Sequence, residues 1–141
     1  MTKHLLIVED NPNDLELART ALELSDICCE VQVACDGQEA LDLLRHSEHL
    51  PDLVLLDLNM PRVSGHEVLQ RVKSDTLLRR VPVVVFTTSS ELRDRLAATA
   101  AGADDYVVKP GGFEELVETL NALGRRWLAT AHAPLRLLTV L

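Results

Sequence analysis

The most constraining feature of this sequence is a fivefold alternation of short apolar runs with amphipathic stretches. The apolar runs cover residues 5–8, 31–34, 53–56, 83–86 and 106–108. The third and fourth are apolar on both sides of the pleat, as in strands covered by helices on both faces, whereas the second alternates and is expected at a sheet edge. Strands that alternate with helices through short loops form a mostly parallel sheet. The sequence therefore predicts an α/β fold, a doubly wound sheet of five strands in the order 2-1-3-4-5 with five helices.

Residues that start helices follow the apolar runs. The predicted caps are Asn11 before Pro12, Asp36 three residues before Glu39, Ser64 three residues before Glu67, and Ser89 or Ser90. The helix that follows the two serines holds Leu92, Leu96 and Ala100. The last helix keeps its apolar period from residue 113 to residue 128, through a glycine.

Composition limits the partners and the compartment. The 141 residues make one domain, and 14 basic against 22 acidic side chains give a net charge of −8. This charge, with only 3% aromatic residues, argues against a surface for nucleic acid or anionic membrane. No apolar run approaches the roughly 20 residues of a membrane span, and the N-terminus lacks the pattern of a signal peptide. Three cysteines without a CxxC spacing indicate reduced thiols, so we expect a cytoplasmic protein.

Ionisable and hydroxyl side chains follow four of the predicted strands. Glu9 and Asp10 follow the first strand, Asp57 ends the third, Thr87 follows the fourth and Lys109 follows the fifth. In the predicted topology, ligands bind outside the carboxyl ends of the strands, at the switch point between strands one and three. Clustered carboxylates raise one another's pKa, and a hard divalent cation such as Mg²⁺ relieves this. A carboxylate beside Mg²⁺, with a lysine and a hydroxyl nearby, suits in-line attack on a phosphoryl group, and Asp57 is the best candidate for the nucleophile.

Longer motifs around these residues carry a resemblance to a known family. They are residues 8–10 (VED), 36–41 (DGQEAL), 56–65 (LDLNMPRVSG), 85–88 (VFTT) and 103–110 (ADDYVVKP). Over about residues 3–123 the chain resembles a response regulator receiver domain, the phosphoacceptor part of a two-component system. The resemblance implies a flavodoxin-like receiver fold for residues 1–123. It also implies that the chain is not an enzyme beyond self-catalysed phosphotransfer to Asp57 and slow autodephosphorylation.

The resemblance assigns roles by position. It implies that Asp57 takes a phosphoryl group from the phosphohistidine of a sensor histidine kinase. Glu9 and Asp10 would hold Mg²⁺ or Mn²⁺ together with Asp57 and the backbone carbonyl of Asn59. Lys109 would pair with the phosphoryl group, and the family usually has a cis peptide between this lysine and the proline that follows it.

Switch residues are implied in the same way. Thr87 is the hydroxyl that swings toward the phosphate, and Tyr106 is the aromatic side chain that turns inward behind it. Asn59 and Ser89 lie two residues beyond Asp57 and Thr87, at positions that tune dephosphorylation in this family.

Residues 124–141 differ from the acidic remainder of the chain, because they hold three arginines and no acid. We expect them to prolong the last helix as far as Pro134 and then to form an apolar arm, with no output domain. The arm either folds onto its own domain or crosses to a second copy in a symmetric homodimer. The candidate dimer contacts are Phe113, Trp127, Leu128, Leu135, Leu137 and Leu138. On this reading the signal leaves by phosphorylation-dependent association.

Three local features point to a subfamily. They are residues 85–89 (VFTTS), the Asn11-Pro12 helix entry and residues 126–128 (RWL). The combination resembles the single-domain regulators that pair with bacterial phytochromes. A bacteriophytochrome is therefore among the expected kinase partners.

Two other functions compete with the phosphoacceptor. The first is a small Mg²⁺-dependent phosphatase of the haloacid dehalogenase type, which also uses an aspartate nucleophile at a strand end. That family requires a second acid two residues later, where this chain has Asn59. The second is a phosphorylation-independent binding module. The argument against it is that all five residues of the phosphoacceptor site are intact, namely Glu9, Asp10, Asp57, Thr87 and Lys109.

Overall fold

The computed structural model describes residues 2–128 of the chain. Within them, five strands form one parallel sheet in the order β2-β1-β3-β4-β5, which confirms the predicted topology. The strands are β1 (Lys3–Val8), β2 (Cys29–Ala34), β3 (Leu53–Leu56), β4 (Val83–Thr87) and β5 (Asp105–Val108). The register aligns their carboxyl ends, since Val8 is paired with Ala34 on one side and with Leu56 on the other.

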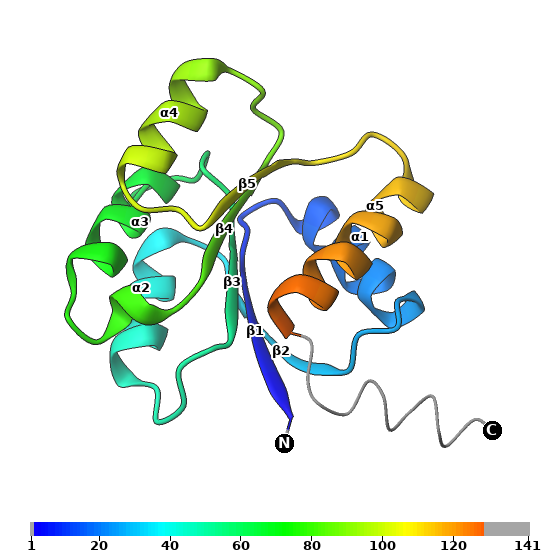
Figure 1. Ribbon diagram of the computed structural model, residues 1–141, viewed down its shortest axis with the longest axis horizontal. Coiled ribbons are helices and arrows are strands. Elements are labelled where there is room, and N and C mark those ends of the chain that lie inside the picture. The colour runs from blue at the N-terminus through cyan, green and yellow to red at the C-terminus, as the bar shows by residue number, and fades with distance from the viewer. Residues whose placement is uncertain (1, 129–141) are drawn as a thin grey trace.

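Helices cover both faces of the sheet. They are α1 (Pro12–Leu24), α2 (Gly37–His46), α3 (Gly65–Ser74), α4 (Leu92–Ala100) and α5 (Phe113–Leu123), with short turns η1 (Leu78–Arg80) and η2 (Gly124–Leu128). In Figure 1 the sheet stands between two layers, with α2, α3 and α4 on one side and α1 and α5 on the other.

Side chains that alternate along each strand build two separate cores. On β3, Val54 and Leu56 pack into the core beneath α2, α3 and α4, while Leu53 and Leu55 pack beneath α1 and α5. Every residue of β3 and β4 is buried, as their continuous apolar character predicts. The edge strand β2 alternates between partly buried and exposed residues, again as predicted.

The helix caps follow the sequence in three places and depart from it in one. Asn11, Asp36 and Ser64 each accept a backbone N–H in the first turn of α1, α2 and α3. The prediction for α4 was wrong, because its N-cap is Glu91, which makes no capping hydrogen bond with its side chain. The Ser89 hydroxyl is engaged elsewhere, as described below.

The last helix continues past Leu123 as a wider π turn, from Gly124 to Leu128. A Cβ at Gly124 would lie 2.4 Å from side-chain carbons of Ile27, so a larger residue would require the Ile27 side chain to move. Leu128 is 6% exposed and belongs to the core beneath α1 and α5, against which Trp127 also packs. The buried indole N–H of Trp127 has no hydrogen-bond partner within residues 2–128, and the Arg126 guanidinium lies 5.1 Å from its ring centroid.

None of the helices formed by residues 2–128 combines the length and the apolar character needed to cross a bilayer.

Candidate functional site

The carboxyl ends of four strands carry the side chains that the sequence singled out. Backbone hydrogen bonds continue the sheet beyond the strands and fix these residues. The N–H of Glu9 donates to the carbonyl of Ala34, at 3.0 Å, and the N–H of Asp57 donates to the carbonyl of Val8, at 3.1 Å. The N–H of Lys109 donates to the carbonyl of Thr87, at 2.7 Å. The site is therefore built on the rigid sheet rather than on its loops.

Three carboxylates meet at this end of the sheet. One oxygen from each of Glu9, Asp10 and Asp57 lies within 4.8 Å of the other two. Glu9 and Asp57 are buried, with 5% and 8% of their surface exposed, while Asp10 is exposed. Burial raises the pKa of the Glu9 carboxyl, and the neighbouring charge of Asp57 adds to this, even though Lys109 opposes it. A group of carboxylate oxygens with excess negative charge, two of its three residues buried, fits a hard divalent cation such as Mg²⁺ or Mn²⁺.

Lys109 is the cation that faces these carboxylates. Its ammonium forms an ion pair with Glu9 and lies 3.2 Å from Asp14 Oδ2, on the first turn of α1. Burial on its own would lower the pKa of Lys109. The hydrogen bond to Glu9 and the charges of Asp57, Glu9 and Asp14 outweigh burial and raise it. The ammonium is therefore held charged beside Asp57. The sequence reasoning did not assign Asp14 to the site, because its position also fits the acidic first turn of any helix.

The loop after β3 brings the start of α3 against the phosphoacceptor candidate. The N–H of Gly65 donates to the carbonyl of Leu58, at 3.0 Å. A Cβ on Gly65 would lie 2.1 Å from the backbone oxygen of Asp57, so this approach requires glycine. Asn59, two residues after Asp57, has an exposed side chain. Its backbone carbonyl as a metal ligand stays a prediction.

The two switch candidates are both buried. Thr87 is 0% exposed, and its hydroxyl oxygen accepts from the N–H of Ser89, at 3.4 Å. Tyr106 is 7% exposed, and its hydroxyl donates to the carbonyl of Ser89, at 2.8 Å. The ring of Tyr106 is thus held inward, and its role as a switch stays a prediction.

The hydroxyl of Ser89 is bound to a residue outside the carboxylate cluster. The hydroxyl donates to Asp94 Oδ2 on α4, at 2.6 Å. Asp94 is a second residue that sequence reasoning missed. Its spacing of five residues from Ser89 is the only signal, and that spacing shows a contact only once the start of α4 is known.

One expectation from the resemblance is wrong for this structure. All peptide bonds within the described part of the chain are trans, including the bond between Lys109 and Pro110.

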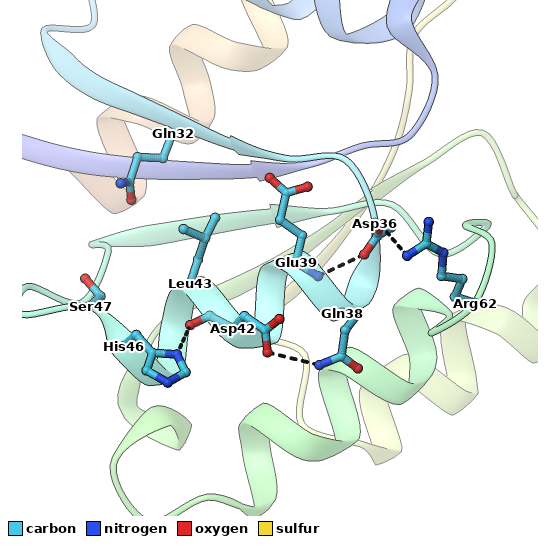
Figure 2. A pocket seen from close by; sticks show the side chains of 9 residues that line it. All are labelled: Gln32, Asp36, Gln38, Glu39, Asp42, Leu43, His46, Ser47 and Arg62. Atoms are coloured by element: carbon cyan, nitrogen blue, oxygen red, sulfur yellow. Dashed lines mark hydrogen bonds and ion pairs between the residues drawn. The ribbon is translucent and has the colours of Figure 1, made fainter.

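Two cavities lie near the α1 and α2 helices. The first, of about 220 Å³, opens beside Asp57 and Lys109 and is lined by Leu17 of α1 and Phe86 of β4. The second, of about 510 Å³, lies over α2, as Figure 2 shows. Some of its polar side chains bind one another, and others bind backbone groups. The dashed lines in Figure 2 join Asp36 to Arg62 and to the Glu39 N–H, and Gln38 to Asp42.

Comparison with known proteins bears on the whole arrangement. The chain matches the response regulator receiver domain family over residues 5–121. The probable methanogenesis regulatory protein FilR2 of Methanothrix harundinacea is 39% identical over 134 residues, which cover 92% of this chain and 86% of the relative.

Two solved structures share the fold closely. The phosphorylated cyanobacterial phytochrome response regulator RcpA is 37% identical, with a TM-score of 0.86 over 93% of this chain and 97% of its own. The Mn²⁺-bound response regulator Rcp1 is 34% identical, with a TM-score of 0.82 over 92% of this chain and 96% of its own. Because the family match spans most of the sequence, and the sheet order agrees with these structures, the chain belongs to the response regulator receiver domain family.

Proposed function

We propose that this protein is the phosphoacceptor of a two-component phosphorelay and that Asp57 receives the phosphoryl group from a sensor histidine kinase. One observation carries the proposal. Asp57 is buried at the end of the central strand, in a three-carboxylate cluster that Lys109 faces. Its carboxylate therefore lies near the Lys109 ammonium and the carboxylates that could hold a divalent cation, the groups that in-line phosphoryl transfer needs, and it is shielded from bulk water.

The metal would be held by Glu9, Asp10 and Asp57, with the carbonyl of Asn59 as a further oxygen. When bound, Mg²⁺ supplies positive charge that neutralises the phosphoryl oxygens and aligns them for attack. The Mn²⁺ bound by Rcp1 supports a divalent ion in this class of pocket.

The chain's own residues perform the remaining work. Asp57 supplies the attacking oxygen. Lys109, held charged by its acidic neighbours, would exchange its ion pair with Glu9 for the new phosphoryl group. The Thr87 hydroxyl would donate to the same group. Hydrogen bonds to a charged group contribute about 1.5–3 kcal/mol each. Two such hydrogen bonds together approach the roughly 5.5 kcal/mol needed to invert a 1:99 equilibrium between an inactive and an active conformation.

The first test is chemical labelling. Asp57→Asn is expected to abolish the phosphoryl adduct that forms with acetyl phosphate and Mg²⁺, measured by intact-protein mass spectrometry, because the amide is not a nucleophile. Asp42→Asn, an exposed acid on α2, is the matched control and should label like the natural chain.

Either of two results would contradict the proposal. One is an acid-labile adduct that survives Asp57→Asn. The other is sustained turnover of p-nitrophenyl phosphate, which would favour the haloacid dehalogenase type of phosphatase instead. Labelling that stops after one phosphoryl group per chain supports the phosphoacceptor.

We propose further that a bacteriophytochrome is among the kinases that phosphorylate this chain. RcpA, a phytochrome response regulator, supports this through its close fold and 37% identity. Phosphotransfer profiling against purified histidine kinases, phytochrome and other, is the direct test. Equal rates from all of them would contradict a phytochrome pairing.

We also propose that the phosphorylated protein signals by association, as a homodimer. Apolar side chains are exposed along the β5 edge of the sheet and support this proposal. They are Leu92 and Leu96 of α4, Val108 of β5 and Phe113 of α5. Leu128 is not retained as a dimer contact, because it is buried in its own domain. Leu135, Leu137 and Leu138 lie outside the described residues.

A further inference from the structure

Ser89 makes contacts that neither the carboxylate cluster nor Lys109 explains. Its hydroxyl donates to Asp94 Oδ2, at 2.6 Å, and accepts from the N–H of Glu91, at 3.3 Å. Its carbonyl accepts from the Tyr106 hydroxyl, at 2.8 Å, and its N–H donates to Thr87 Oγ1, at 3.4 Å. One residue therefore touches both switch side chains and the first turn of α4.

Asp94 is itself held in place from a second helix. His66 of α3 lies with Nε2 3.4 Å from Asp94 Oδ1, so each carboxylate oxygen has a partner. The Asp94 side chain is only partly exposed, at 26%. The hydrogen bond from Ser89, followed by the contact with His66, lowers the pKa of Asp94 in spite of partial desolvation. Asp94 is thus a charged acceptor, and hydrogen bonds to charged acceptors are the stronger ones.

Arg95, the residue after Asp94, contacts the switch side chain of Tyr106. The guanidinium of Arg95 lies 4.7 Å from the ring centroid of Tyr106, a cation–π distance. Two consecutive residues of α4 therefore act on Tyr106, one through Ser89 and the other directly on the ring. A shift of the first turn of α4 would disturb both contacts together.

We propose that Asp94 is a positioning residue that holds Ser89 so that Tyr106 stays inward, and that this arrangement strengthens binding of a phosphoryl group at Asp57. We call Asp94, Ser89 and Tyr106 the Ser89 latch, with His66 as its support. The second half of the proposal rests on the proposed function, whereas the position of Tyr106 does not.

A purely structural role is the alternative that the test must separate. Because Glu91 makes no side-chain cap, the Ser89 hydroxyl and Asp94 also tie down the first turn of α4. A cap alone would change the melting temperature when it is removed, but not the environment of Tyr106.

The chain offers a single-site reporter, since Tyr106 is its only tyrosine. Full-length protein labelled with 3-fluorotyrosine gives one ¹⁹F resonance for the position of this ring. Asp94→Ala and Ser89→Ala are each expected to shift that resonance in the same direction, in metal-free protein. The double variant should shift it by much less than the sum of the two single shifts, because both substitutions break the same bond between Ser89 and Asp94. His66→Ala should give a smaller shift of the same sign.

The second measurement is a titration with beryllofluoride and Mg²⁺, followed by the same resonance. Asp94→Ala and Ser89→Ala are expected to weaken the apparent affinity by about tenfold, the lower range for a charged hydrogen bond that is partly exposed. Ser89→Thr keeps the hydroxyl and should restore most of the loss. Glu91→Gln removes a charge from the same turn, where it pairs with Arg93, and should behave like the natural chain.

The outcomes distinguish a failure of the Ser89 latch from a failure of the proposed phosphoacceptor function. An unchanged ¹⁹F resonance in both alanine variants, with a lowered melting temperature, would show that Asp94 is only a helix cap and would overturn the latch. A shifted resonance with unchanged beryllofluoride affinity would overturn its effect on the phosphoryl group. A natural chain that fails to bind beryllofluoride contradicts the proposed function, and the latch is then judged by the metal-free resonance alone.

Discussion

At the scale of single residues, the carboxylate cluster holds more negative charge than Lys109 balances. The pKa of Glu9 is raised by burial and by the charge of Asp57. In metal-free protein, Asp57→Asn should therefore raise the melting temperature at pH 7 by about 3 °C, the effect of relieving roughly 1 kcal/mol of repulsion in a domain of this size. Thermal melts in a chelator, with Asp42→Asn as control, measure this.

The raised pKa of Glu9 also determines how the stability gained by Asp57→Asn changes with pH. A carboxyl whose pKa is raised on folding binds its proton in the folded protein at a pH where the unfolded chain is still ionised. The repulsion between Glu9 and Asp57 is thus present at neutral pH and disappears as the pH falls through the raised pKa. The gap between Asp57→Asn and the natural chain should narrow on acidification. A variant that melts below the natural chain at pH 7 contradicts the repulsion.

The site residues at strand ends could be predicted from the sequence, whereas those on helices could not. Glu9, Asp57 and Lys109 follow strands, and parallel strands bring their carboxyl ends together whatever the details of packing. Asp14 and Asp94 sit on helices, where the direction of a side chain depends on how the helix is docked. A single sequence does not contain that information, so their contacts with Lys109 and Ser89 became visible only in the structure.

At the scale of elements, the side chain of Asp75, the C-cap residue of α3, binds the backbone that leads into η1. Asp75 Oδ1 accepts from the N–H of Leu77, at 2.8 Å, and from that of Leu78, at 3.0 Å. The bond from Leu78, followed by that from Leu77, lowers the pKa of Asp75 below its ordinary value of 3.8. Such a group contributes stability that is complete above its unfolded pKa and is lost as the pH falls through its folded pKa.

Asp75→Ala is therefore expected to lower the urea midpoint of unfolding at pH 7, because two backbone N–H groups lose their acceptor. The difference from the natural chain should shrink as the pH falls below 3.8. Glu48→Ala, which removes an exposed acid from the loop before β3, is the control and should leave the midpoint unchanged. A difference that grows on acidification would contradict the assigned role.

Most elements could be predicted, and the exceptions have physical causes. Strand positions and three helix caps follow from local chemistry, since Asn11, Asp36 and Ser64 bond within their own turns. The start of α4 was missed because Ser89 bonds to the switch region and to Asp94 rather than capping in the usual way. The π turn brings Gly124 close to the side chain of Ile27, far away in the sequence, and local periodicity does not register such a contact.

At the scale of the whole molecule, association is the property to test. We expect the full chain with beryllofluoride and Mg²⁺ to be a dimer by light scattering, and deletion of residues 129–141 gives the monomer mass if the arm, rather than the exposed side chains of α4, β5 and α5, joins the two copies. The deletion leaves Leu128 in the core, so the domain itself should stay folded. An unchanged dimer after the deletion would refute an arm that crosses to a second copy, and would direct attention to the exposed side chains of α4, β5 and α5.

The π turn at the end of α5 has an optical consequence. Trp127 is the chain's only tryptophan, and its indole N–H is buried without a partner within residues 2–128. The rest of the side chain is partly buried, and the guanidinium of Arg126 lies 5.1 Å from the ring centroid, so the partial burial and this cation both influence the emission of the indole. The fluorophore is separated by one residue from residues 129–141 of the sequence. A second copy that docks beside Trp127 would change the wavelength and intensity of its fluorescence emission, so assembly can be followed in unlabelled protein.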